Sequence, residues 1–175
     1  EGLQEYLYRT VRHRKLKKKE FLLKAGYAHR CIFFIRSGLL RAFYEKDDQE
    51  VSSAFMKEGD TIVSIDSFYE QEKSHEFIQA IEDSELYCIG FQELEYIYRE
   101  YAEFNFIGRV LAIRHLKSRT HQLYGIRMRS ARERYDWLMT DCPDIVSRVP
   151  VKDIASYLDI GRETLTKIRR AMMKV

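Results

Sequence analysis

Cysteine is scarce in this sequence, and long apolar runs are absent. The 175 residues include only Cys31, Cys88 and Cys142, which are far apart and stand in no CxxC or Cys/His spacing. This pattern favours buried small side chains over a disulfide framework or a zinc knuckle. No stretch approaches the ~18 consecutive apolar residues of a membrane span, and the opening EGLQEYLYRT has neither a signal-peptide core nor an initiator Met. We therefore expect a soluble, cytoplasmic protein, trimmed at its N-terminus, with no membrane partner.

The signatures of common enzymes are also missing. The sequence contains no P-loop, no Rossmann fingerprint and no nucleophile elbow. His29 and His75 are isolated, and no histidine pair precedes a third ligand at cupin spacing. We expect no catalytic residues, no metal and no enzyme activity.

Charge is distributed unevenly along the chain. Residues 1–108 carry 15 Lys and Arg against 20 Asp and Glu, a net charge of −5, whereas residues 109–175 carry 15 against 7, a net charge of +8. A positive segment is typical of a nucleic-acid-binding module, although basic solvated helices that bind nothing are common. The hydrophobic share of 45% is enough for a core in one domain or two small ones.

Turn chemistry divides the first half into short strands. Apolar runs alternate with turn residues from Phe21 to Phe91, as in an antiparallel β-roll or barrel. Gly26, Gly38 and Gly59 fall between the runs, where positive φ is wanted. The charged residues 46–48 are expected at a hairpin tip. The basic run Arg12–Phe21 reads as a solvated edge, with DNA contact as the alternative.

A long helix follows the strands. The spacing predicts a helix over Glu103–Met128. One half of its wide apolar face is expected to pack on the roll and the other on a second copy of the helix, giving a homodimer; the alternative is burial within its own chain. The candidate dimer-helix residues are Phe104, Phe106, Ile107, Val110, Leu111 and Ile113.

The end of the chain predicts a helix-turn-helix. A helix over Ser130–Thr140 opens on a capping box formed by Ser130 and Glu133, and Pro143 ends it. Two short helices then flank the turn DIG, with Ile154, Ala155 and Leu158 inside the first and Leu165, Ile168 and Met172 inside the second. The outer face of the last helix carries only hydrogen-bonding side chains. These side chains suit base edges in the major groove, although a wet outer face is the simpler alternative.

The stretch GRETLTKIRR carries a family resemblance. A β-roll, a long helix and a terminal helix-turn-helix with this stretch resemble the Crp/Fnr family of bacterial transcription regulators. The runs AIEDSEL and RVPVKDIASYL resemble the branch common in Bacteroidetes. The resemblance implies an α+β fold: an N-terminal roll like the cyclic-nucleotide-binding jelly roll over residues 1–102, a dimerisation helix over 103–128, and a winged-helix-type helix-turn-helix over 129–175.

The resemblance also implies roles for single residues. Arg162, Glu163 and Lys167 would contact base edges of double-stranded DNA, with Lys167 replacing the family's arginine. Backbone phosphates would be bound by Lys152, Thr164, Thr166, Arg169 and Arg170. Activation would require a surface for RNA polymerase as a further partner.

Cyclic AMP is an unexpected ligand despite the family's roll. Where nucleotide binders carry Gly-Glu and Arg-Ser-Ala, this chain has Val63 and Ser64, and then Ser74, His75 and Glu76. The phosphate arginine is missing, and Glu76 would repel an anion. No cofactor is therefore predicted. Ser64, Asp66, Ser67, His75 and Glu76 could line a pocket for another small-molecule effector or be the remnant of a lost site.

These expectations define one leading function and one alternative. The leading function is a homodimeric transcription regulator on a palindromic operator. The alternative is an effector- or metal-binding, cupin-like roll whose C-terminal helices serve only for dimer packing.

Overall fold

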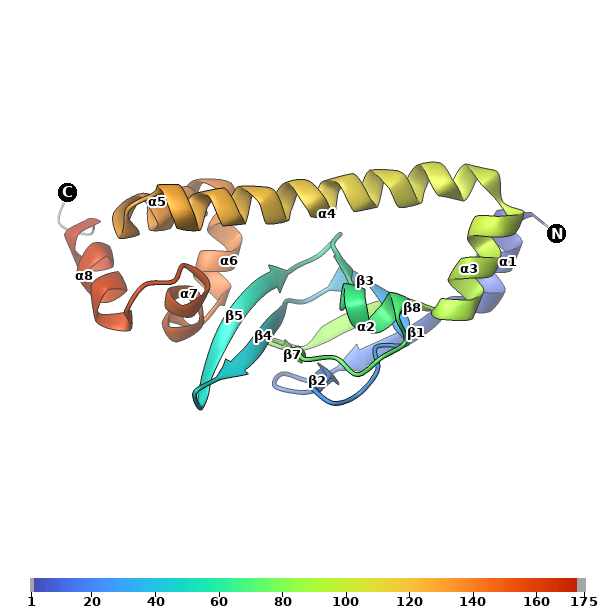
Figure 1. Cartoon of the computed structure of the whole chain (residues 1–175), viewed down its shortest axis with the longest axis horizontal. Coiled ribbons are helices and arrows are strands. Elements are labelled where there is room, and N and C mark those ends of the chain that lie inside the picture. Colours follow the sequence, from blue (N-terminus) through green and yellow to red (C-terminus); the bar gives the residue numbers. More distant parts are fainter. Residues whose placement is uncertain (1, 173–175) are drawn as a thin grey trace.

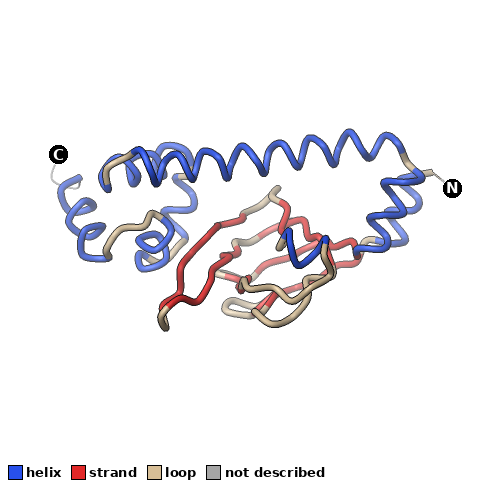
Figure 2. Tube along the Cα trace, viewed as in Figure 1, coloured by secondary structure: helices blue, strands red, loops and turns tan. Residues whose placement is uncertain are grey.

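Two four-stranded antiparallel sheets form the body of the protein. The computed structural model describes residues 2–172. One sheet has the order β1-β8-β3-β6 and the other β2-β7-β4-β5, and Figure 2 shows the strands gathered beneath one long helix. The strands are β1 (Arg12–Leu16), β2 (Phe21–Leu23), β3 (Cys31–Ser37), β4 (Leu40–Lys46), β5 (Gln49–Met56), β6 (Thr61–Ile62), β7 (Phe77–Ala80) and β8 (Ser84–Gly90).

Helices flank this roll at both ends and above it (Figure 1). They are α1 (Leu3–Thr10), α2 (Ile65–Tyr69), α3 (Phe91–Glu100), α4 (Ala102–Met128), α5 (Ala131–Asp141), α6 (Pro143–Arg148), α7 (Val151–Tyr157) and α8 (Arg162–Met172). The expected α+β class, with its antiparallel roll, is confirmed. Within residues 2–172, none of the helices combines the length and the apolar character that a membrane crossing needs.

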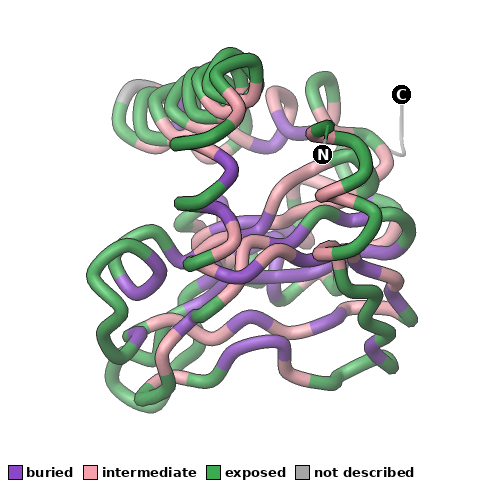
Figure 3. Tube along the Cα trace, turned by 90° about the vertical axis from the view of Figure 1, so that its right-hand side faces the viewer, coloured by how far each residue is buried: buried purple, intermediate pink, exposed green. Residues whose placement is uncertain are grey.

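Alternating burial builds the core of the roll. Strand β8 alternates between buried and half-buried residues along its whole length, as expected for side chains that point to opposite faces of a sheet. Figure 3 shows the buried residues concentrated in the strands, while the long helix carries mainly exposed ones. The fully buried members include Ile35, Leu40 and Leu86.

The turns follow the glycines and the charged tip that the sequence indicated. Gly26, Gly38 and Gly59 all have positive φ. Asp47 and Asp48 have φ of +51° and +57° and join β4 to β5, whose end residues Lys46 and Gln49 pair. Two successive positive φ values are those of a type I′ hairpin. These expectations are confirmed.

Several elements were not expected from the sequence. Strand β1 lies within the run read as a solvated edge: it pairs only with β8 at the sheet edge, and four of its five residues are exposed. The edge interpretation is confirmed, but the strand itself shows no apolar alternation. The sequence predicts only that Pro143 ends the preceding helix, whereas Pro143 also opens α6 in its first turn.

A second apolar core joins the roll to the last four helices, α5 to α8, which we call the C-terminal unit. Leu138, Ile154 and Leu165 are buried at its centre. From the roll, Leu39 is fully buried in the same cluster, and Phe55 and Ile81 pack against it. The C-terminal unit is therefore docked on the roll through apolar contact as well as through the linking helix α4.

His29 is a structural group of the roll. It is 3% exposed and stacks on Phe33 with ring centroids 5.5 Å apart. Its Nδ1 accepts a hydrogen bond from the Ser64 amide at 2.9 Å, and its own amide donates to the Ser67 hydroxyl at 2.8 Å. Burial lowers the pKa of His29 from 6.5 to about 4, with a smaller contribution from Arg14.

Replacement of Gly38 is expected to be costly. Gly38 has a φ of +105°, and a Cβ at this position would lie 2.7 Å from the Cα of Ser84. Gly26 also has positive φ but nothing within 4 Å of a Cβ. Both Gly→Ala variants lose about 1–2 kcal/mol to backbone strain, and Gly38→Ala should lose roughly 1–3 kcal/mol more through overpacking. Urea denaturation measures both values, and equal losses would contradict this account.

His29 should give the protein a pH-dependent stability. Because the folded-state pKa is about 4 and the unfolded value 6.5, the unfolded chain binds more protons between these limits. The free energy of unfolding should therefore fall as the pH drops from 6.5 towards 4, by up to about 3 kcal/mol from this residue. Denaturation at several pH values should show a flatter profile for His29→Gln than for the wild type. An unchanged slope in His29→Gln refutes the assignment.

Candidate nucleic-acid interface and ligand cavity

Two short helices and a tight turn form a helix-turn-helix at the C-terminal end. Helices α7 and α8 are joined by residues 158–161, with Asp159 at a φ of +52°. Ile154, Ala155, Leu158 and Leu165 are buried between the helices. Ile168 and Met172 pack against the same cluster. The inner face is the one that the apolar spacing predicted.

The outer face of α8 is open to solvent. Arg162, Glu163, Thr164 and Lys167 are exposed, as is Arg170, while Thr166 and Arg169 are half-buried. Within residues 2–172, none of these charged side chains forms an ion pair. The Thr166 hydroxyl donates to the Arg162 carbonyl at 2.9 Å, which leaves its oxygen as an acceptor. The predicted base-contacting residues thus share one exposed surface, and Figure 1 shows α8 at the end of the molecule remote from α1 and α3.

Lys152 lies apart from that surface. It is exposed near the start of α7, and its Nζ is 3.9 Å from Glu50 Oε2 on β5. The predicted backbone-contacting set is therefore divided between α8 and the border with the roll. The last three residues of the predicted segment 129–175 lie outside the described part of the chain.

Arg134 holds the turn of the helix-turn-helix. Its Nη1 donates to the carbonyls of Leu158 and Asp159 at 2.8 and 3.0 Å, and its Nε donates to the Arg129 carbonyl at 3.0 Å. One side chain therefore ties the end of α7 to the junction between α4 and α5. Sequence reasoning missed it because an arginine in a charged helix gives no sign of such long-range contacts.

The junction itself is capped as the sequence predicted. The Ser130 hydroxyl accepts from the Glu133 amide, and the Glu133 carboxylate accepts from the Ser130 amide at 2.8 Å. The Ser130 amide and the Ser130 hydroxyl both donate to this carboxylate and lower the pKa of Glu133. The capping box fixes the start of α5 directly after the end of α4.

Helix α4 presents two different faces. Leu111 faces the roll, and Phe104 packs on Tyr98 with ring centroids 5.5 Å apart. On the outer side Phe106, Val110 and Ile113 are 62%, 47% and 48% exposed, and Ile107 is 44% exposed. A row of large apolar side chains in water is the usual mark of an unpartnered interface.

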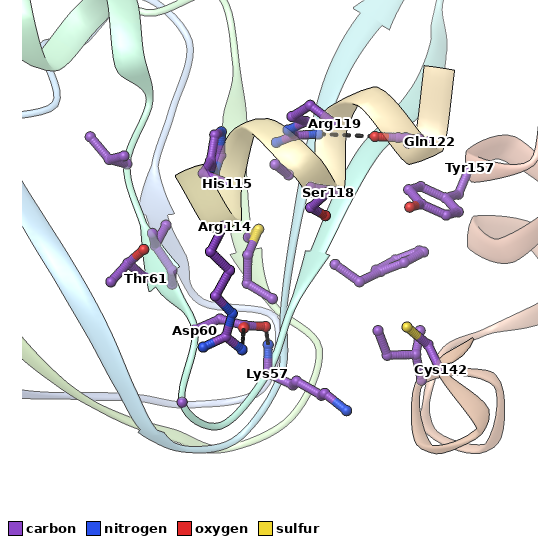
Figure 4. Close-up of a pocket in the computed structure, with 18 of the residues that line it drawn as sticks. Lys57, Asp60, Thr61, Arg114, His115, Ser118, Arg119, Gln122, Cys142 and Tyr157 are labelled. Atoms are coloured by element: carbon purple, nitrogen blue, oxygen red, sulfur yellow. Dashed lines mark hydrogen bonds and ion pairs between the residues drawn. The ribbon is translucent and has the colours of Figure 1, made fainter. Parts of the chain in front are cut away.

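A cavity of about 290 Å³ lies between the roll, α4 and the C-terminal unit. Figure 4 shows Arg114, His115, Ser118 and Arg119 of α4 along one wall, with Tyr157 of α7 beside them. Its apolar lining comes from β4, β5 and β6 and from α5 and α6, and includes Ala42, Phe55, Ile62, Leu138 and Ile145. The volume is close to the lower end for small-molecule sites, about 300 Å³.

The charged side chains at the cavity already have ion-pair or hydrogen-bond partners. Arg114 Nη2 lies 3.2 Å from Asp60 Oδ1, and Arg119 donates to the Ser53 carbonyl at 2.7 Å. Burial and the charge of Arg119 lower the pKa of His115. Burial raises the pKa of Tyr157 to about 12. The wall therefore presents a neutral phenol and favours a neutral imidazole near neutral pH.

The predicted effector residues do not gather around this cavity. Ser64 and Ser67 are buried, where the Ser64 hydroxyl is 3.1 Å from that of Ser74 and the Ser67 hydroxyl donates to the Glu72 carbonyl at 2.6 Å. Asp66 and His75 are exposed. Glu76 alone of the five lines the cavity, and it accepts a hydrogen bond from Tyr44 at 2.5 Å. No group of three potential metal ligands occurs among residues 2–172.

Solved structures share this fold over nearly the whole chain. CooA from Carboxydothermus hydrogenoformans aligns with a TM-score of 0.76 and 20% identity, covering 99% of this chain and 85% of its own. FixK2 from Bradyrhizobium japonicum aligns with a TM-score of 0.77 and 15% identity, covering 94% of this chain and 85% of its own. A Crp/Fnr-family transcriptional regulator from Eubacterium rectale aligns with a TM-score of 0.75 and 17% identity, covering 97% of this chain and 82% of its own.

Comparison at the level of sequence is more restricted. No protein of curated function matches this chain significantly, and the Bacteroidetes branch stays a prediction. The family model of the cyclic nucleotide-binding domain matches residues 13–101, from β1 to the end of α3. Because that match spans half of the sequence and the structural neighbours are Crp/Fnr regulators, this chain belongs to the cyclic nucleotide-binding domain family and has the Crp/Fnr fold.

Proposed function

We propose that this protein is a sequence-specific DNA-binding transcription regulator of the Crp/Fnr type. The observation that carries the proposal is the outer face of α8, where Arg162, Glu163 and Lys167 are exposed and, within residues 2–172, have no ion-pair partner. Arginine can grip guanine through two hydrogen bonds, and a carboxylate can accept from cytosine. Arg134 fixes the turn that precedes these residues. The proposed localisation is the cytoplasm, where bacterial DNA lies.

The same proposal makes the protein a homodimer on a palindromic operator. The outer row Phe106, Val110 and Ile113 supplies an apolar surface that a second copy of α4 can cover by the same residues, as a twofold axis requires. Two recognition helices would then enter successive major grooves about one helical turn apart.

Cyclic AMP is not the proposed effector. At the positions where the family resemblance places the phosphate, Ser74 is buried against Ser64 and Glu76 adds a carboxylate to the cavity wall. The arginine that the resemblance expects beside the phosphate is missing at these positions, and the cavity's Arg114 and Arg119 are engaged with Asp60 and with the Ser53 carbonyl. We infer that any effector in the cavity differs from a cyclic nucleotide.

A metal-dependent or cupin-like roll is the weaker candidate. Among residues 2–172 no three potential ligands lie close enough to hold a metal ion. His29, the most buried histidine, is engaged with Ser64 through Nδ1. A DNA-binding protein and a cupin-like protein differ sharply in salt dependence, because only the former releases counterions from phosphate.

Selection from a random pool of double-stranded DNA tests the proposal. The purified full chain, at near-physiological salt and without added ligand, should enrich a palindrome, and addition of cyclic AMP should leave its affinity unchanged. Affinity for the enriched site should fall steeply with salt. Failure to enrich any sequence with and without cyclic AMP would count against the assignment.

Loss of Arg162 should relax base preference. Arg162→Ala is expected to weaken operator binding by ~1–3 kcal/mol and to remove the preference at one base pair in each half-site, because a bidentate base contact is lost. The exposed Arg36→Ala on β3 changes the same residue type far from α8 and should leave binding unchanged. Fluorescence anisotropy with operator variants measures both effects. A full preference retained by Arg162→Ala would sink the role given to this side chain.

Charge on the outer row of α4 should dissociate the dimer. Ile113→Asp places a carboxylate in the apolar interface and should raise the dimer dissociation constant at least about tenfold, since an unpaired buried charge is costly. Ala112→Asp adds the same carboxylate at the neighbouring exposed position, away from the row. Sedimentation velocity separates monomer from dimer. Equal behaviour of the two variants would argue for another interface.

A further inference from the structure

A side chain of α7 occupies the outer edge of strand β5. β5 is the last strand of its sheet, so its outward backbone groups have no neighbouring strand. The Ser156 hydroxyl of α7 accepts from the Ser52 amide at 2.9 Å and donates to the Glu50 carbonyl at 3.0 Å. One side chain of the helix-turn-helix thus takes the place of a paired strand at this edge.

An ion pair lies beside Ser156, between the roll and the same helix. Arg41 of β4 is 3% exposed and Asp153 of α7 is 6% exposed. Their Nη1 and Oδ1 atoms are 3.0 Å apart, and the same Nη1 lies 2.7 Å from Glu50 Oε2. The Arg41 Nε donates to the Ser52 hydroxyl at 2.8 Å. This guanidinium therefore binds β5 and α7 at once.

Stability alone does not account for charges at this position. Removing two ions from water costs much of what their attraction returns, so a buried ion pair is weak support for stability. The Nη2 of Arg41 is buried and, among residues 2–172, has no hydrogen-bond partner, which adds a further cost. The apolar contacts of Leu39, Phe55 and Ile81 already hold the two parts together.

Direction is what the polar contacts add. Apolar contact is non-directional and permits sliding or rotation of one surface on another. The planar guanidinium, in contrast, donates hydrogen bonds to carboxylates only along its N–H bonds. Together with Ser156, Arg41 and Asp153 specify one orientation of α7 on β5.

The docked orientation leaves the recognition surface open. Arg162, Glu163 and Lys167 are exposed while Asp153 and Ser156 are engaged with the roll. In Figure 1, α7 faces β5 and α8 lies on the far side of α7. The contact with the roll therefore does not cover the residues proposed to contact bases.

We propose that Arg41 and Asp153 are positioning residues that fix the helix-turn-helix on the roll and thereby set the separation of the two recognition helices in the dimer. This inference rests on the proposed function. The roll, rather than the link at Arg129 and Ser130 alone, then determines which spacing of half-sites the protein binds. Base preference remains the property of α8.

The first test needs no DNA. Trp137 is the single tryptophan of the sequence and packs on the core of the C-terminal unit, so its time-resolved fluorescence anisotropy reports how that unit moves. In the full-length wild type it should decay with the slow tumbling of the whole molecule. Asp153→Asn should add a faster nanosecond component.

Two further variants make this test decisive. Ser156→Ala removes the bridge at the β5 edge without leaving a charge buried alone, and it should produce the same component even if Asp153→Asn fails to fold. Arg36→Gln breaks the exposed pair with Glu85 (3.3 Å) on the roll and should behave as wild type. Anisotropy in folded Asp153→Asn and Ser156→Ala that matches the wild type overturns the proposal.

The second test separates spacing from base preference. DNA carrying the selected half-sites at the preferred spacing, and at one base pair more or less, is bound by each variant. Wild type should favour one spacing by about tenfold or more, and Ser156→Ala or Asp153→Asn should reduce that ratio to about threefold or less with the half-site sequence unchanged. An unchanged spacing ratio overturns the proposal.

Failure of the proposed function would have a different result. If the wild type selects no DNA, the assignment as a DNA-binding regulator fails, and the anisotropy measurement still decides whether Arg41 and Asp153 hold the C-terminal unit in place.

Discussion

The unpaired edge of strand β5 is the constraint on which the arrangement of this molecule depends. An edge strand carries a row of amide and carbonyl groups that must be hydrated or bonded. Here a bulge between Ala42 and Phe43 of β4 and their partners on β5 shifts the register, and the Ser53 carbonyl accepts from Arg119 and from Gln122 of α4 at 2.7 and 3.0 Å. Ser156 satisfies the next groups along the strand. Hydrogen bonds to the same strand, β5, therefore fix the positions of both α4 and the helix-turn-helix.

The cavity lies next to this same strand, at the place where α4 and the C-terminal unit both contact it. Phe55 of β5 contacts the Tyr157 ring at a centroid distance of 5.1 Å and also lines the cavity. Arg119, which binds the edge of β5, also lines the cavity. The roll, α4 and the C-terminal unit all contribute to its wall. Its shape is therefore coupled to the orientation that the polar contacts of α7 specify.

Local signals in the sequence predicted local structure, and long-range pairing left no comparable signal. The glycines with positive φ, the capping box at Ser130 and the inner face of the helix-turn-helix could be predicted because each depends on residues a few positions apart. Arg41 and Asp153 come from distant segments that each resemble an exposed charged surface, and nothing nearby marks them as buried. Strand β1 was hidden for the opposite reason, since an edge strand exposed on both faces has no alternation. For the predicted effector residues Ser64 and Ser67, the sequence could not reveal that their hydroxyls bond within the roll.

The uneven charge of the chain also stabilises the contact between the roll and the C-terminal unit. Arg148 of α6 forms ion pairs with Glu58, at 2.9 Å, and with Glu82, and the Nζ of Lys152 lies 3.9 Å from Glu50 of β5. The arginine lowers the pKa of Glu58 to about 2, so this contact persists well into the acid range. Part of the positive charge of residues 109–175 thus neutralises the acidic roll, and the net +8 of that segment overstates what a DNA backbone would meet. The charges of α8, which the roll does not neutralise, are the ones that a phosphate backbone can use. The acidic roll therefore anchors the basic C-terminal unit and leaves the charges of α8 without compensation from the roll.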